Sequence, residues 1–368
     1  MRALILALDT EVPKTCVSQE EFSSVATRLL GIPNSKTRLL NRIVAGSQIK
    51  KRHVILADFL DDASQEMFFR RDDKGQLPGT GKRNQLYKKE APKLAEAVCY
   101  KTLKQWGGDP KAITHVISVS CTGMIAPGIE FLLIKLLGLS RNVERLGINF
   151  MGCFGAFKGI AIAKALAMEN ANHRILVVCT ELCSLHFQED QNTDTMVANS
   201  IFADGAAAVI VGVEPRKGEK PLFEIHNQGS AALDDSLDDM TWEATDHGYQ
   251  MRLSASVPTL LENNILPFAR RIIGSTPSFN QCMWAVHPGG RSILESVAKA
   301  CALQREQLSA SWKVLNDYGN MSSPTFLFVL SEGLKCLCQK KWVVGLGFGP
   351  GLSIEGLLLK RVAENVAE

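Results

Sequence analysis

The sequence predicts an α/β fold made of two similar halves, and two observations support this. Short apolar runs rich in β-branched residues alternate with apolar stretches of helical length, which is the pattern of buried strands covered by helices. The spacing of four polar residues also repeats. Cys121, just after a predicted strand, precedes Cys153 by 32 residues, and His287, also just after a strand, precedes Asn320 by 33. Such an internal duplication predicts two halves with a site at their interface.

The first half, residues 1–220, opens with an apolar segment that predicts a buried strand ending at a proline turn. The first hundred residues otherwise have helical and irregular patterns, and the charged stretch 70–83 predicts an exposed loop. The regular elements that follow are predicted as strands at 112–120, 144–149, 174–179 and 206–213, and as helices at 129–139 and 154–168.

The second half, residues 221–368, repeats the order of strand, helices and closing strands. Its elements are predicted as strands at 282–286, 342–346 and 352–360, and as helices at 292–303 and 323–334. The glycine-rich residues 347–351 join the last two strands. They lack the Lys-Ser/Thr of a phosphate-binding loop, so we expect them to shape the wall of a cavity.

Composition excludes several classes of function. Of 368 residues, 46% are hydrophobic and 21% charged, and the net charge of +3 is too balanced to indicate nucleic-acid binding. The run Lys50-Lys51-Arg52 fits a solvated face, with a weak attraction for an anionic small molecule as the alternative. No apolar run reaches the roughly 18 residues of a membrane span. The ten cysteines, with Cys336 and Cys338 among them, have neither disulfide nor zinc spacing, which predicts a cytoplasmic protein without a metal site.

Cys153 is the candidate nucleophile. It precedes a helix rich in glycine and alanine, so the free N–H groups and partial positive charge of the helix N-terminus would stabilise a thiolate. The small residues Gly155 and Ala156 would let a substrate approach the backbone. Taken alone, Cys153 fits a buried structural cysteine better than a nucleophile.

His287 and Asn320 favour a catalytic role for Cys153 over a structural one. His287 ends a buried strand ahead of Pro-Gly-Gly, and Asn320 lies at a helix start in YGNMSS. Separately they fit a capping histidine and a helix N-cap. Together, His287 can pair with the Cys153 thiolate, and both side chains can donate hydrogen bonds to a thioester carbonyl. The set predicts an enzyme that carries an acyl group on Cys153 and condenses it with a malonyl unit that loses CO2.

Segments around these residues resemble the type III polyketide synthases, the chalcone synthase-like enzymes. They are GCFGAFKGI, HPGGRSILE, YGNMSS, GFGPGLSIE, SQIKKRHVIL, CTGMIAPGIE and FADGAAAVIVG, so the resemblance covers nearly the whole chain. It implies a thiolase-like, five-layered αβαβα fold and a homodimer. It also implies acyl-CoA starters, malonyl-CoA as the extender and no bound cofactor.

The resemblance assigns roles to individual residues. Cys153, His287 and Asn320 correspond to the catalytic triad. Phe202, in SIFADG, corresponds to the aromatic gatekeeper between a CoA tunnel and the cavity, and Met251 lies near a second gatekeeper position and would line the cavity. The segments HPGG and NMSS add three candidates for substrate contact, namely Gly289, Gly290 and Ser322.

Contact with the CoA phosphates is expected to be thinner than in plant members of the family. Arg42 matches one of the cationic residues that hold these phosphates. The neighbouring cationic positions of the plant pattern fall near Leu39 and Gly46, so Arg38 or Lys50 would supply any further charge.

The expected cavity residues differ from those of plant enzymes. Thr122 lies in the CTG turn, Cys183 and His186 replace small hydroxyl residues, and Trp242 falls near a position that is small in plant chalcone synthases. These segments resemble the microbial branch, whose members make alkylpyrones or alkylresorcinols from fatty acyl starters, or naphthols from malonyl-CoA alone. His186 fits a satisfied buried residue equally well, and Glu181 fits a structural carboxylate bonded to backbone N–H groups.

Three other readings stay open at this point. A ketoacyl-ACP synthase III would perform a single condensation with an acyl carrier protein, although its asparagine segment typically reads GNTSA. An HMG-CoA synthase would need a glutamate acid/base near the cysteine, which is not apparent. A non-catalytic acyl-binding subunit should have lost one of Cys153, His287 and Asn320, and all three are present.

Overall fold

The structure is a computed structural model. It describes residues 1–60, 67–275, 277–335 and 340–362. Cys336 and Cys338, for which the sequence predicts no zinc site, lie outside these ranges.

The strands are β1 (Ala3–Glu11), β2 (Thr15–Ser18), β3 (Lys51–Val54), β4 (His115–Ser120), β5 (Glu144–Asn149), β6 (Arg174–Leu182), β7 (Asp204–Val213), β8 (Phe223–Ala232), β9 (Met240–Thr245), β10 (Gly248–Leu253), β11 (Cys282–Val286), β12 (Trp342–Gly349) and β13 (Ser353–Arg361). The α-helices are α1 (Gln19–Leu30), α2 (Asn34–Gly46), α3 (Thr80–Trp106), α4 (Ile129–Leu136), α5 (Gly155–Glu169), α6 (Thr193–Ile201), α7 (Val257–Ile273), α8 (Arg291–Ala300), α9 (Ser309–Tyr318) and α10 (Thr325–Lys335).

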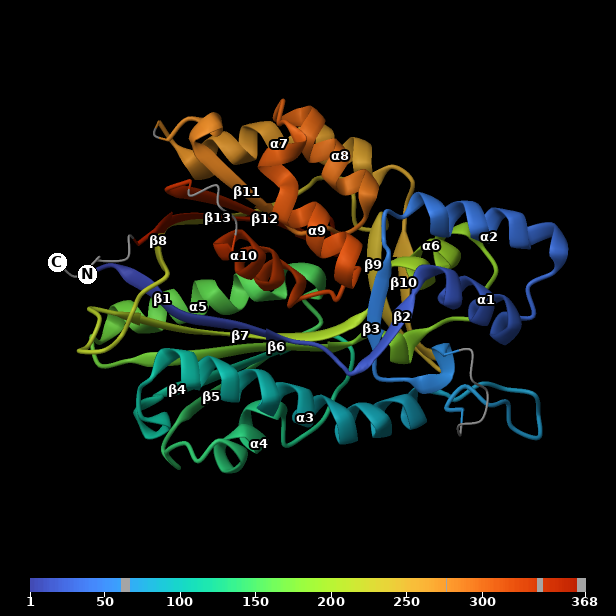
Figure 1. Ribbon diagram of the computed structural model, residues 1–368, viewed down its shortest axis with the longest axis horizontal. Coiled ribbons are helices and arrows are strands. Elements are labelled where there is room, and N and C mark those ends of the chain that lie inside the picture. Colours follow the sequence, from blue (N-terminus) through green and yellow to red (C-terminus); the bar gives the residue numbers. More distant parts are fainter. Residues whose placement is uncertain (61–66, 276, 336–339, 363–368) are drawn as a thin grey trace.

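The elements stack in five layers. Within the described ranges, nine strands pair in the order β11-β12-β13-β8-β1-β7-β6-β4-β5. Figure 1 shows that this ladder forms two sheet layers with α5 and α10 between them. Helices α7 and α8 cover one outer face, and α3 and α4 cover the other. The αβαβα architecture implied by the family resemblance is therefore confirmed.

Strand order confirms the internal duplication. In the first half, β1-β7-β6-β4 pair antiparallel, antiparallel and parallel in turn. In the second half, β8-β13-β12-β11 repeat the same order and the same three orientations. The two halves join where β1 pairs with β8, at Leu4 with Glu224 and Ile5 with Phe223.

The two central helices are apolar because both sheets cover them. The Phe157 ring of α5 lies 4.0 Å from the Phe326 ring of α10, measured between centroids. A Cβ on Gly155 would lie 2.6 Å from Val119 Cγ1 of β4. Gly155 therefore allows close packing of α5 on the sheet, which corrects the expectation that it opens the backbone to a substrate.

The bounds of several elements differ from the predicted ones by a few residues, and local features explain the differences. Helix α10 starts at Thr325, not at 323, because Ser322 has a φ of +58° and Pro324 disfavours helical geometry in the residue before it. Strand β4 starts at His115 because the side chain of Asp109 caps a 3₁₀ turn at Pro110–Ala112. Helix α4 ends at Leu136, ahead of a glycine in the left-handed region.

Two arginines in stretches expected to be exposed are in fact buried. Arg83 belongs to α3, beyond the exposed loop, and donates hydrogen bonds to the carbonyls of Pro78, Leu185 and Phe187. Arg52 lies on β3 and is 2% exposed, so the run that contains it is not a solvated face throughout. In both cases backbone carbonyls from distant segments provide the acceptors, which a local charge pattern does not reveal.

Candidate active site

Cys153 lies in the turn between β5 and α5. This turn has an unusual backbone, since Phe150 and Gly152 have φ values of +57° and +67°. A Cβ on Gly152 would lie 2.6 Å from Pro350 Cδ, so the glycine-rich turn between β12 and β13 packs directly against the residue before Cys153. Gly152–Phe154 forms one 3₁₀ turn ahead of α5.

Asn320 is held against Cys153 by both its backbone and its side chain. Its N–H donates to Ile201 O, and its carbonyl accepts from Ala203 N, each at 2.9 Å. Asn320 Oδ1 accepts from Ser322 N at 2.8 Å, which fixes the orientation of the amide. Nδ2 then lies 3.9 Å from Cys153 Sγ and donates to Gly289 O at 3.3 Å.

His287 ends β11 and is almost completely buried. Its backbone N–H donates to Leu346 O at 2.8 Å, and Gly289 N donates to His287 O at 2.9 Å. Its two ring nitrogens form no hydrogen bond with any described residue. Because Gly289 O accepts from Asn320, the structure brings His287, Asn320 and Cys153 into one connected site, in which the imidazole retains its hydrogen-bonding capacity for a ligand.

Burial controls the charges in this site. It raises the pKa of Cys153 to about 11, partly offset by hydrogen bonds from Ser322 and Asn320. It lowers the pKa of His287 to about 3. The thiolate stabilisation expected from the helix N-terminus is outweighed in this conformation, because desolvation favours the neutral thiol and the neutral imidazole. A proton acceptor must act during attack by the sulfur.

Glu181 ties the two halves together beneath the site. This fully buried carboxylate accepts hydrogen bonds from five donors, namely Ser120 Oγ (3.2 Å), Cys121 N (2.9 Å), Cys121 Sγ (3.3 Å), Thr122 Oγ1 (2.7 Å) and Ser323 Oγ (2.5 Å). Burial raises its pKa. The arrangement fits the structural carboxylate expected at Glu181, and it leaves the Thr122 hydroxyl engaged. Cys121 Sγ is also 3.3 Å from Ser322 Oγ.

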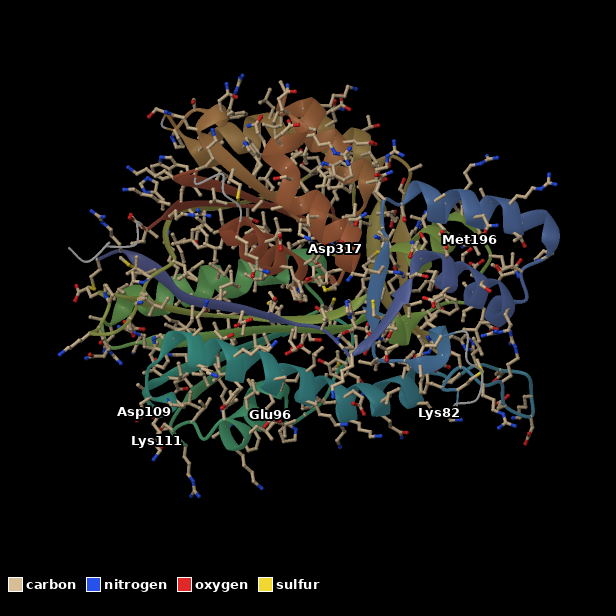
Figure 2. The ribbon with its side chains drawn as sticks, in the orientation of Figure 1. Lys82, Glu96, Asp109, Lys111, Met196 and Asp317 are labelled. Atoms are coloured by element: carbon tan, nitrogen blue, oxygen red, sulfur yellow. The ribbon has the colours of Figure 1, made fainter. Side chains whose placement is uncertain are left out.

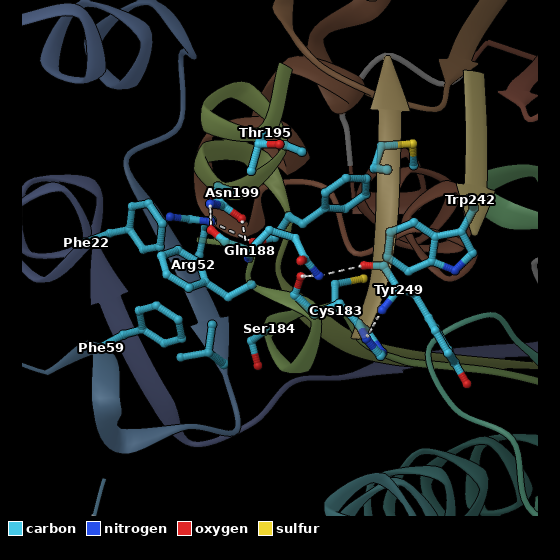
Figure 3. A pocket seen from close by; sticks show the side chains of 16 residues that line it. Phe22, Arg52, Phe59, Cys183, Ser184, Gln188, Thr195, Asn199, Trp242 and Tyr249 are labelled. Carbon is cyan, nitrogen blue, oxygen red and sulfur yellow. Dashed lines mark hydrogen bonds between the residues drawn. The ribbon is translucent and has the colours of Figure 1, made fainter. Parts of the chain in front are cut away.

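An inner cavity of ≈ 40 Å³ collects most of the expected specificity residues (Figure 3). Cys183, His186, Phe202, Trp242 and Met251 all line it. The indole Nε1–H of Trp242 donates to Cys121 O at 2.7 Å, which anchors this wall to the turn after β4. Phe22 of α1, Phe59 of the 3₁₀ turn after β3 and Tyr249 of β10 also line the cavity. Phe22 and Phe59 are remote in the sequence from the motifs, and Tyr249, although two residues before Met251, belongs to a hairpin that no apolar run predicted.

His186 lines this cavity and also links two distant segments of the chain by hydrogen bonds. Its Nε2 lies 2.7 Å from Thr122 O, and its Nδ1 accepts from Tyr249 N at 3.0 Å. The ring stacks on Tyr249 with 4.3 Å between centroids. These contacts fix the neutral tautomer with the proton on Nε2, and burial lowers the pKa to about 3.

An outer cleft of ≈ 480 Å³ opens at the glycine turn that follows His287. It is lined by Arg42 of α2, by Gly289 and Gly290, and by Arg291 at the start of α8. The sequence predicted the first three of these and missed Arg291. Lys50, an alternative cation, lines a separate groove beside α1 and α2.

No group of three or more His, Cys, Asp or Glu side chains gathers as a metal site in the described part of the chain. Among the same residues, every helix is too short or too polar to cross a membrane.

Comparison with known proteins identifies the family. The model for the N-terminal domain of chalcone and stilbene synthases matches residues 1–215, and the model for their C-terminal domain matches residues 224–363. A curated relative, "Probable polyketide synthase 1" of Dictyostelium discoideum, is 35% identical over 98% of this chain. The chain spans 11% of the length of that relative.

Solved structures agree with this assignment. The crystal structure of the C-terminal type III polyketide synthase domain of 'Steely1', a type I/III hybrid from Dictyostelium, has a TM-score of 0.92 and 34% identity, covering 99% of this chain and 100% of that one. The structure of PKS-I from the brown alga Ectocarpus siliculosus has a TM-score of 0.91 and 31% identity, covering 98% of each chain. Both halves of this chain thus belong to the chalcone and stilbene synthase family, which makes it a type III polyketide synthase, an enzyme of the acyltransferase class.

Proposed function

We propose that the protein loads an acyl group from an acyl-CoA onto Cys153, extends it by repeated decarboxylative condensation with malonyl-CoA, and cyclises the product. The observation that carries this proposal is the position of Asn320 Nδ2, 3.9 Å from Cys153 Sγ, in one network with a buried imidazole whose ring nitrogens are unpaired within the described residues. These three groups match the needs of acyl transfer: a nucleophile, a proton acceptor and a hydrogen-bond donor for an oxyanion.

In the loading step, the Cys153 sulfur attacks the thioester carbonyl of the acyl-CoA. His287 accepts the thiol proton, since burial keeps its imidazole neutral and a neutral ring nitrogen has a free lone pair. Asn320 Nδ2 donates to the developing oxyanion. The bond from the carbonyl carbon to the CoA sulfur then breaks, the proton on His287 passes to CoA, and the acyl group remains on Cys153.

In the extension step, malonyl-CoA loses CO2, and the electron pair of the broken carbon–carbon bond moves onto the thioester carbonyl. His287 and Asn320 donate hydrogen bonds to the resulting enolate oxygen, so no carboxylate base is required. The enolate carbon attacks the acyl thioester of Cys153. A carbon–carbon bond forms, and the bond between the acyl carbon and Cys153 Sγ breaks.

The cavity lining supports an apolar starter. Phe22, Phe59, Phe202, Trp242 and Met251 present rings and a thioether to the inner cavity. Apolar walls of this kind favour burial of an acyl chain over a polar starter. We therefore place an alkylpyrone or an alkylresorcinol first among the products. Arg42, beside Gly289 and Gly290 in the outer cleft, lies where the phosphates of the incoming CoA would pass.

A second copy of the chain is the partner that the surface supports. Strand β5 ends the ladder and has no outer neighbour among the described residues. Leu146 on β5 and Phe131 and Leu136 on α4 are 42%, 46% and 42% exposed. An open edge strand flanked by apolar side chains favours pairing with another chain. We propose a homodimer formed across this edge.

We also assign the protein to the cytoplasm. The described cysteines, seven of them buried, are all free thiols, which suits a reducing compartment.

Purified protein incubated with 13C-labelled malonyl-CoA and a panel of acyl-CoA starters tests the function directly. Mass spectrometry should find a product that contains more than one extender unit, and Cys153→Ala should abolish it. A product only from malonyl-ACP, with a single extension, would instead indicate a ketoacyl-ACP synthase. A labelled naphthol formed without any starter would indicate the malonyl-only reaction, and no turnover on either substrate would indicate an acyl-binding subunit.

A further inference from the structure

We propose that Arg52 is a positioning residue, which holds the end of α6 and through it the backbone of Asn320. The proposal rests on the proposed role of Asn320 as an oxyanion donor. Arg52 does not touch Cys153 in any described contact. Its importance lies in what it fixes, namely the segment that carries Phe202 and forms a bridge to Asn320.

The Arg52 guanidinium is locked in place on several sides. Its Nε donates to Gln19 Oε1 at 3.0 Å, and its Nη1 donates to Asn199 O at 2.9 Å and to Phe202 O at 2.6 Å. The guanidinium carbon lies 3.7 Å from the centroid of the Phe22 ring. Figure 3 shows Arg52 between Phe22 and Asn199 at one side of the inner cavity.

These bonds satisfy the end of α6. The last four carbonyl groups of a helix have no N–H donor within the helix, so they need donors from elsewhere. Arg52 supplies donors to Asn199 and Phe202, and Gln19 Nε2 donates to Ser200 O at 2.8 Å. The remaining carbonyl in this row, that of Ile201, accepts from the backbone of Asn320. One set of contacts thus orients the carbonyl that binds Asn320.

Arg52 also packs against the residue before Asn320. Gly319 has a φ of +70°, and a Cβ there would lie 2.8 Å from Ile201 O and 3.0 Å from Arg52 Cγ and Cδ. The arginine stem and the end of α6 therefore leave no room for a side chain at Gly319. A shift of Arg52 would therefore affect Asn320 in two ways. It would change the space around Gly319, the residue before Asn320, and it would move the Ile201 carbonyl that accepts the Asn320 N–H.

The positive charge suits this position. A cation near the C-terminal end of a helix interacts favourably with the helix dipole. Burial lowers the pKa of Arg52 to about 9, and the nearby Asp204 carboxylate opposes that shift. Arg52 thus stays protonated at neutral pH. Its Nη2 has no hydrogen-bond partner among the described residues, so Nε and Nη1 carry the positioning contacts.

The first test compares Arg52→Met, Asn320→Ala and the double variant in malonyl-CoA decarboxylation. A misplaced catalytic donor costs on the order of 10²-fold in rate. We expect Arg52→Met to lose roughly 10- to 100-fold in decarboxylation, whereas the double variant should be no slower than Asn320→Ala alone, because both changes remove one function. Arg52→Lys, which keeps the charge and a donor, should recover part of the rate.

Arg174→Met is the matched control. Arg174 is another fully buried arginine, paired with Glu219 at 2.8 Å, at the opposite end of β6 from Glu181. It should lower the Tm comparably and leave decarboxylation by the folded protein unchanged. Rate losses that multiply in the Arg52 and Asn320 double variant would overturn the positioning role.

Hydrogen exchange followed by mass spectrometry tests the same role without relying on activity. Peptides covering 199–203 and 319–320 should exchange faster in Arg52→Met than in the wild type, and at the wild-type rate in Arg174→Met. Unchanged exchange in Arg52→Met would refute the positioning role even in an active enzyme. Faster exchange in a protein that decarboxylates nothing would support Arg52 while refuting the proposed function.

Discussion

Cys153 is a buried thiol whose surroundings oppose ionisation. Burial raises its pKa to about 11, and hydrogen bonds with Ser322, Asn320 and the backbone of Cys153 offset this only in part. In the proposed mechanism its reactivity at neutral pH comes from His287, which accepts the thiol proton. This assigns His287 a role in loading as well as in decarboxylation.

Replacing His287 by Gln should shift the reactivity of Cys153 to higher pH. Without the imidazole no neighbouring base accepts the thiol proton during attack, so the thiol, whose pKa burial raises to about 11, must ionise before it reacts. The rate of Cys153 alkylation by iodoacetamide, measured by peptide mass spectrometry from pH 5 to 10, should rise at higher pH in His287→Gln than in the wild type. Superimposable profiles would mean that His287 does not activate the sulfur.

The buried imidazole of His186 should destabilise the fold in acid. Its pKa falls from 6.5 to about 3 on folding, so the unfolded chain binds a proton in that window and the folded chain does not. The contribution of the neutral His186 imidazole to the free energy of unfolding is fully present above pH 6.5 and is lost as the pH falls towards 3. His186→Gln should reduce the slope of unfolding free energy against pH by up to about 1.4 kcal/mol per pH unit, measured by urea denaturation between pH 7 and 4.5.

Only the slopes are compared in this experiment, because the substitution also changes two hydrogen bonds. Asp204, whose pKa burial raises to about 6, contributes a slope of opposite sign in both proteins. Parallel slopes for wild type and variant would show that His186 already carries a proton in the fold.

At the scale of single residues, the sequence predicted the candidate catalytic residues but did not predict which arginines are buried. Cys153, His287 and Asn320 stand in short motifs whose residue types already indicate acyl transfer. The buried positions of Arg52 and Arg83 depend on carbonyls far away in the sequence, so no local pattern predicts them. Arg291 was missed because its place in the outer cleft depends on how α8 meets α2 and α6.

The hairpin β9–β10 forms one wall of the inner cavity through Trp242, Tyr249 and Met251. It pairs only with itself and brings Trp242 and Tyr249 over the turn after β4. The inner cavity that remains has a volume of ≈ 40 Å³. The hairpin therefore limits the room for a growing chain.

Trp242→Ala should enlarge the cavity and lengthen the products. The substitution removes the indole and its hydrogen bond to Cys121 O, so some loss of Tm is expected as well. Mass spectrometry of products formed with one fixed starter should show additional extender units. Met251→Leu, a change of similar volume at the same cavity, should leave the distribution unaltered. An unchanged distribution in Trp242→Ala would show that another wall limits chain length.

Most strands of the nine-stranded ladder were predictable from short runs in the sequence. The structure has β5 and β11 at the predicted 144–149 and 282–286, and it has β4, β6, β7, β12 and β13 with shifts of a few residues. The sequence assigned no element between 214 and 281, where β8, β9, β10 and α7 lie. Strand β8 is half exposed and the hairpin stands apart from the main ladder, so neither has a continuous apolar run.

On the scale of the whole molecule, the duplication predicted from two matching spacings is present in the strand order. The strands β7 and β8 end and begin at Val213 and Phe223, so the boundary at 220/221 falls between them. That residues 1–220 and 221–368 form separate domains stays a prediction. The pairing of β1 with β8 joins the two halves into one ladder.

The open edge at β5 predicts an oligomeric state. Leu146→Arg should place a charge in the proposed dimer contact and convert the dimer to a monomer in sedimentation-velocity experiments. Leu237→Arg is the matched control, since Leu237 is 77% exposed and lies outside β5 and α4. A wild-type protein that sediments as a monomer, or a Leu146→Arg variant that remains a dimer, would exclude this edge as the interface.

The proposed mechanism requires that Cys153 carries the growing acyl group. It is tested most directly by incubating the protein with an acyl-CoA, quenching in acid, and mapping the adduct by peptide mass spectrometry. The proposed mechanism predicts one acyl group per chain, on the peptide that contains Cys153. This acyl group should disappear on addition of malonyl-CoA as product forms. An acyl group on another cysteine, or loading that persists in Cys153→Ala, would contradict it.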